Sequence, residues 1–67
     1  MQMNSSHTPH RPRAAKLKRA ATEYGFPYTS MRDAGIRGEF PLIRIGKALY
    51  AEYRDLDRWV EARKSRP

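Results

Sequence analysis

The chain has 67 residues, of which 14 are lysine or arginine and 7 are aspartate or glutamate, so its formal net charge is +7. This length allows one small domain, since folded domains rarely contain fewer than about 50 residues, and it leaves little volume for the shaped pocket that an enzyme needs. The lack of cysteine excludes a disulfide framework, and no apolar run approaches the roughly 18 residues that cross a bilayer.

The first segment, residues 1–12, contains prolines and polar residues and almost nothing apolar. Such a composition cannot offset the entropy lost on ordering, so we predict a flexible arm over residues 1–12 and a folded domain over residues 13–65. His7 and His10 lie in the arm without a third ligand nearby. We therefore expect no metal site and no cofactor.

The first predicted helix covers residues 14–24. An apolar side chain recurs every three or four residues, as on one stripe of an amphipathic helix: Ala14, Leu17, Ala21 and Tyr24. Gly25 follows directly, at the position where a left-handed helix cap is needed. The pattern therefore predicts a helix that ends in a tight turn.

A second short helix is predicted over residues 27–37. Pro27 is tolerated because it lies at or before the first turn. An alternative start has Ser30 as the N-cap with Asp33 three residues later, which would shorten the helix to two turns; we prefer the earlier start. The apolar stripe of this helix consists of Met31, Ala34 and Gly35.

Glycine is unfavourable inside this second helix. It costs about 0.8 to 1 kcal/mol relative to alanine, so we expect another backbone to approach closely at Gly35. Gly38 is expected to end the helix, and Pro41 prevents the helix from resuming.

Two short strands are predicted over residues 42–45 and 49–51, around a turn that contains Gly46. A three-residue loop would place Arg44 and Tyr50 together on the outer face of the hairpin, with the isoleucines on the inner face. A two-residue loop would instead place Tyr50 with the isoleucines. The sequence leaves both alternatives open.

The last predicted helix covers residues 53–64, with acidic residues near its positive N-terminal end. Its apolar positions have helical spacing: Tyr53, Leu56, Trp59 and Val60. Trp59 and Phe40 are expected to belong to the core. The predicted fold class is therefore mainly α with a small β-hairpin, in the order of a winged helix-turn-helix: helix, turn, helix, wing, C-terminal helix.

Three blocks of sequence carry a resemblance to a known family. Gly25-Phe26 closes the first helix, residues 38–47 read GEFPLIRIGK, and residues 55–60 read DLDRWV. With these blocks, in this order and spacing, the stretch over residues 15–60 resembles the excisionase and AlpA-like winged-helix proteins. These proteins are relatives of the DNA-binding domain of the MerR regulators.

The resemblance implies a protein that binds double-stranded DNA sequence-specifically. As an excisionase it would bind adjacent attachment sites, bend the DNA, associate with further copies of itself and direct an integrase towards excision in a bacteriophage or mobile element. Family members often carry a Ser or Thr cap where Pro27 stands, and a basic residue where Asp33 stands. A small AlpA-like transcriptional regulator is the alternative, and a protein-interaction module such as an antitoxin is the alternative from a different class.

The second helix is the candidate recognition helix, because an α-helix fits the major groove, where each base pair shows a distinct pattern. Arg32 is the principal candidate, since its planar fork can bond guanine O6 and N7 together. Asp33 would accept from a cytosine amine, hold Arg32 in place or simply cap the helix. The predicted recognition-helix contacts are Tyr28, Thr29, Arg32, Asp33 and Arg37.

The hairpin is the predicted wing, with contacts to phosphates or to the adjacent minor groove by Arg44, Lys47 and Tyr50. The first helix of helix-turn-helix proteins crosses the DNA backbone. The basic run at its start therefore supplies further candidate phosphate contacts: Arg13, Lys16, Lys18 and Arg19. The competing interpretation of all these cations is an ordinary solvated surface.

The high positive charge favours polyanionic partners, because neutralised phosphates release condensed counterions. Taken together, the sequence predicts a soluble, cytoplasmic, nucleoid-associated DNA-binding protein that is not an enzyme and does not bind a membrane.

Overall fold

The computed structural model describes residues 12–64; the predicted arm, apart from Pro12, and both histidines lie outside the described residues. The described chain is mostly helical and carries a small antiparallel sheet of three strands in the order β1-β3-β2. Its elements in chain order are β1 (Ala14–Lys16), α1 (Leu17–Tyr24), α2 (Tyr28–Ile36), β2 (Ile43–Ile45), β3 (Ala48–Glu52) and α3 (Tyr53–Lys64).

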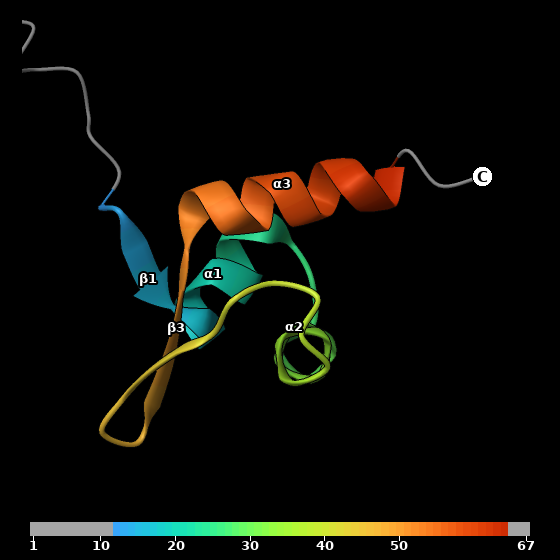
Figure 1. Cartoon of the computed structure of the whole chain (residues 1–67). Helices are drawn as coiled ribbons and strands as arrows, with labels where there is room; N and C mark the ends of the chain where they lie inside the picture. Colours follow the sequence, from blue (N-terminus) through green and yellow to red (C-terminus); the bar gives the residue numbers. More distant parts are fainter. Residues whose placement is uncertain (1–11, 65–67) are drawn as a thin grey trace, which may run out of the picture.

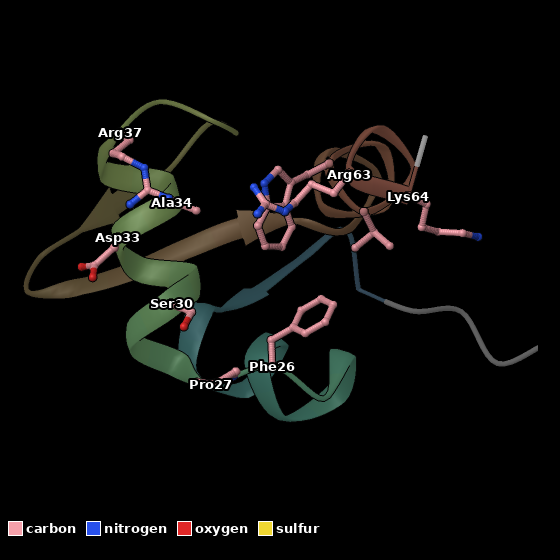
Figure 2. A pocket seen from close by; sticks show the side chains of 10 residues that line it. Phe26, Pro27, Ser30, Asp33, Ala34, Arg37, Arg63 and Lys64 are labelled. Atoms are coloured by element: carbon pink, nitrogen blue, oxygen red, sulfur yellow. The ribbon is translucent and has the colours of Figure 1, made fainter. Parts of the chain in front are cut away.

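The helices and the hairpin are distributed over two ends of the fold. Figure 1 shows α3 across the top of the view, with α1 beneath it, and both α2 and the turn between β2 and β3 at the bottom. Figure 2, from another direction, likewise places α2 and that turn on the side away from α3. The hairpin therefore extends to the same end of the molecule as α2.

The prediction that the first helix starts at Ala14 was wrong, because residues 14–16 form strand β1. Lys16, the last residue before the helical turn, has the extended values φ −54° and ψ 139°. β1 pairs antiparallel with β3, and Ala15 lies opposite Ala51 with both side chains buried. This long-range pairing overrides the helix preference of alanine, and the predicted hairpin becomes a three-stranded sheet.

The loop of the hairpin has two residues, Gly46 and Lys47. Gly46 has a φ of 61°, the left-handed value that glycine adopts at the first central position of a primed hairpin turn. The register places Ile43 opposite Tyr50 and Arg44 opposite Leu49. Tyr50 therefore lies with the isoleucines on the outer face of the sheet, as the two-residue alternative predicted, and the pairing of Arg44 with Tyr50 on one face was wrong.

The predicted end of the first helix and the predicted bounds of the other two are confirmed to within one residue. α1 ends at Tyr24, and Gly25 follows with the left-handed φ of 78°. α2 starts at Tyr28 with Pro27 in the N-cap position, so the later start at Ser30 is not used. Because Pro27 has no backbone N–H to leave unpaired, it fits at this boundary.

A small apolar core joins the elements. Leu17 of α1, Met31 of α2 and Leu56 of α3 are fully buried, and Phe40 from the loop before β2 is 4% exposed. The prediction that another backbone approaches Gly35 was wrong. The neighbour is the side chain of Leu42, which would lie 2.7 Å from a Cβ at this position. The close packing of Leu42 on Gly35 fixes α2 against the segment that leads into the hairpin.

Candidate functional site

α2 buries one face and leaves the rest of its surface open. The buried residues are the predicted Met31, Ala34 and Gly35. On the opposite side, Thr29, Arg32 and Ile36 follow each other at spacings of three and four residues, so they lie in one row along the helix. We call these three residues the open row; Thr29 and Ile36 are exposed and Arg32 is half-buried.

Arg32 is held in position by two neighbours on its own helix. Its guanidinium lies over the Tyr28 ring, 5.8 Å from the centroid, within the range of a cation–π contact. Its Nη2 donates to Oδ1 of Asp33 at 3.5 Å. Of the three roles predicted for Asp33, this contact matches the one in which Asp33 holds Arg32 in place. The Nε atom of Arg32 is buried and has no hydrogen-bond partner among the described residues.

Arg37 lies on a different side of α2 and faces a groove towards α3. The groove has a volume of about 640 Å³, and Figure 2 shows its lining residues. Phe26 and Trp59, which meet edge-on with ring centroids 5.8 Å apart, contribute to its apolar part. Asp33 also contributes to the lining, but its carboxylate points away from α3.

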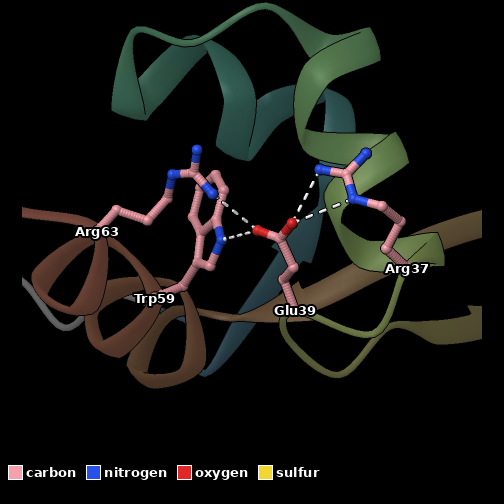
Figure 3. A network of polar contacts seen from close by, with 4 residues as sticks. All are labelled: Arg37, Glu39, Trp59 and Arg63. Atoms are coloured by element: carbon pink, nitrogen blue, oxygen red, sulfur yellow. Dashed lines mark hydrogen bonds and ion pairs between the residues drawn. The ribbon is translucent and has the colours of Figure 1, made fainter. Parts of the chain in front are cut away.

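Glu39 connects the end of α2 to α3 (Figure 3). Arg37 donates to Oε2 of Glu39 from Nη2 at 2.8 Å and from Nε at 3.1 Å. Trp59 Nε1 donates to Oε1 at 2.8 Å, and Arg63 Nη1 donates to the same oxygen at 3.0 Å. We call these four residues the Glu39 cluster.

The hydrogen bond from Trp59, followed by that from Arg37, holds the pKa of the Glu39 carboxyl below its ordinary value. Sequence reasoning missed Glu39, because nothing in the spacing of residues 39, 59 and 63 links them before the chain folds. The guanidinium of Arg37, a predicted DNA contact, is therefore bound to the Glu39 carboxylate in this structure.

The hairpin presents two of its three predicted contacts at the end of the molecule that α2 occupies. Arg44 and Lys47 are exposed, and neither forms an ion pair within residues 12–64. Tyr50 is half-buried on the outer face of the sheet, opposite Lys16 of β1 on one side and Ile43 on the other. The structure therefore separates Tyr50 from Arg44.

The basic run at the start of the domain does not form one surface. Arg13 pairs with Glu52 at 3.1 Å, next to the start of α3. Arg19 pairs with Glu23 at 3.3 Å within α1. Lys16 lies on the outer face of the sheet, whereas Lys18 is an exposed residue of α1. Arg13 in particular lies far along the sheet from the hairpin turn, because its backbone adjoins Tyr53.

Within residues 12–64 no group of three or more His, Cys, Asp or Glu side chains is placed to hold a metal ion. No helix in this part of the chain is long and apolar enough to span a bilayer. Comparisons of the chain with protein-family models, with curated proteins and with solved structures found no match.

Proposed function

We propose that the chain binds double-stranded DNA as a winged helix-turn-helix, with α2 in the major groove and the β2–β3 turn against the adjacent backbone. The observation that carries this proposal is the common placement of α2, the helix that bears the open row, and the hairpin turn at the end of the molecule away from α3. A helix with side chains is about 10–12 Å across, and the major groove of B-DNA is about 12 Å wide. α2 therefore fits the major groove, and the β2–β3 turn at the same end of the molecule can then lie against the adjacent backbone.

The charges at this end suit a polyanion. Arg44 and Lys47 are exposed cations without an ion pair in the described chain. The whole chain carries a net charge of +7. Because contacts to phosphates release counterions, such cations contribute affinity that falls with salt.

In this proposal Arg32 supplies the base readout. Its contacts with Tyr28 and Asp33 restrict the guanidinium before DNA arrives, so less side-chain entropy is lost on binding. The fork can then bond O6 and N7 of one guanine. Arg37, which is bound to Glu39, takes no part in base readout.

The test is the affinity of the chain for a duplex selected from a random library, measured against unrelated competitor DNA at several salt concentrations. Lys47→Ala is expected to weaken binding to all sequences alike and to reduce the slope of log K against log salt by about one. Lys64→Ala, which removes the same charge from the far end of α3, is the matched control and should leave the slope unchanged. Failure to select any preferred sequence, or equal slopes for both variants, would contradict the proposal.

The cellular role proposed with this binding mode is that of an excisionase, and its support is the sequence resemblance carried by residues 25–26, 38–47 and 55–60. Footprinting on the DNA that flanks the gene of this chain tests it. Repeated protected sites beside a recombination core would support excision, with an integrase and further copies of the chain as partners. A single protected promoter site would indicate a transcriptional regulator instead.

A further inference from the structure

Ile36 is an apolar residue in an unusual place. It is the last residue of α2 and is 68% exposed, more than the other large exposed apolar side chains of residues 12–64, Ile45 at 60% and Phe26 at 39%. Its neighbours on the surface of α2 are polar: Thr29, Arg32, Asp33 and Arg37. The surrounding surface of α2 thus offers no apolar cover for this side chain.

The position of Ile36 is fixed by the packing beneath it. Gly35, the preceding residue, is buried under the Leu42 side chain, so the face of the helix that carries Gly35 packs against the core. Ile36 therefore points away from the core, one turn beyond Arg32 in the open row. It shares its direction with the arginine proposed to read guanine.

We propose that Ile36 contacts the 5-methyl group of a thymine in the major groove, close to the guanine read by Arg32. This inference rests on the DNA-binding function proposed above. Thymine carries the one apolar group that the bases display in the major groove. Residues four apart in a helix are separated by about 6 Å along its axis, so the thymine lies within about two base pairs of the guanine, at 3.4 Å per step.

A protein partner fits this surface less well. Ile36 stands alone among polar side chains, and a single isoleucine is much smaller than the apolar patches that mark protein-docking sites. A methyl group on an anionic duplex suits both the size of the apolar surface and the exposed hairpin cations Arg44 and Lys47 at the same end of the molecule.

The experiment replaces thymine by deoxyuridine, one position at a time, in the selected duplex. This change removes a single methyl group and leaves every hydrogen-bonding group in place. The wild-type chain is expected to lose about three- to fivefold in affinity at one position, the loss that burial of one methyl group implies. Ile36→Ala should bind the thymine duplex about that much more weakly and show no further loss with deoxyuridine at that position.

Two variants sharpen the result. Ile36→Val keeps a branched apolar side chain and should retain a deoxyuridine penalty. Ile45→Ala removes the other exposed isoleucine, which lies in β2, and should retain the full penalty. Circular dichroism of each variant, compared with the wild type, confirms that each is folded.

The outcomes separate this inference from the function on which it rests. Specific binding by the wild-type chain without a deoxyuridine penalty near the guanine, or a penalty that persists in Ile36→Ala, would overturn the role of Ile36 alone. An absence of sequence-specific binding by the wild-type chain would overturn both.

Discussion

Arg32 lies within α2, Arg37 follows the helix as its C-cap, and the two arginines meet different surroundings. Within residues 12–64, the guanidinium of Arg32 lies over the Tyr28 ring and donates to the Asp33 carboxylate, both on its own helix. Arg37 is bound through two of its nitrogen atoms to Glu39, which also accepts from α3. The comparison teaches that two arginines five residues apart can be held in different ways. Arg37 joins the end of α2 to α3 through the Glu39 cluster, whereas Arg32 is held by residues of its own helix.

The first prediction tests the Glu39 cluster by removing one of its members, Trp59. Trp59 meets Phe40 and Phe26 edge-on and donates a hydrogen bond to Glu39. Trp59→Ala should therefore lower the free energy of unfolding by about 3 kcal/mol, the lower end for aromatic truncation because Trp59 is half-buried. This loss corresponds to a fall in the thermal midpoint of about 12–24 °C for a domain of this size.

Thermal unfolding followed by circular dichroism checks this value. Thr29→Ala, a truncation in the open row, is the control and should change the stability by less than about 0.5 kcal/mol. An unchanged midpoint for Trp59→Ala would show that the Glu39 cluster does not support the packing of α3.

The second prediction concerns the open row. Arg32→Ala should leave the thermal midpoint almost unchanged but reduce discrimination at one base position by about 1–3 kcal/mol. Arg37→Ala removes the same charge and should keep the base preference, since the Arg37 head group is bound to Glu39. Binding to duplexes with single base changes measures both. An equal loss of affinity for cognate and random duplexes by Arg32→Ala would contradict its role as the reader.

The third prediction tests the charge at the centre of the Glu39 cluster. The folded-state pKa of Glu39 lies below its ordinary value of 4.5, so the ionised carboxylate stabilises the fold above that pH. This contribution is lost as the pH falls through the lower, folded-state pKa. Glu39→Gln should therefore be less stable than the wild type near neutral pH, and the difference should narrow as the solution is acidified.

Denaturant unfolding at a series of pH values measures this difference. Glu61→Gln is the control, because its pair with Lys64 at 3.3 Å is an exposed contact within α3, and exposed pairs contribute little. A stability difference between wild type and Glu39→Gln that does not vary with pH would show that the ionisation of Glu39 is not coupled to folding.

Local sequence determined much of this molecule. The bounds of α2 and α3, the end of α1 at Gly25 and the buried stripe of α2 all follow from side-chain spacing and from the backbone limits of glycine and proline. These features depend on interactions within a few residues, so the sequence predicts them without knowledge of the rest of the fold. The polar composition of the surface of α2 is likewise readable from the sequence.

Only the tertiary structure decided which distant residues meet. Strand β1 exists because residues 14–16 pair with β3, and helical spacing over so short a stretch could not reveal that partner. The hairpin register placed Tyr50 away from Arg44, since a shift of one residue exchanges the two faces of a strand. Glu39, Trp59 and Arg63 meet because the loop after α2 brings Glu39 to α3. These hydrogen bonds join residues about 20 positions apart, and no local pattern encodes such a contact.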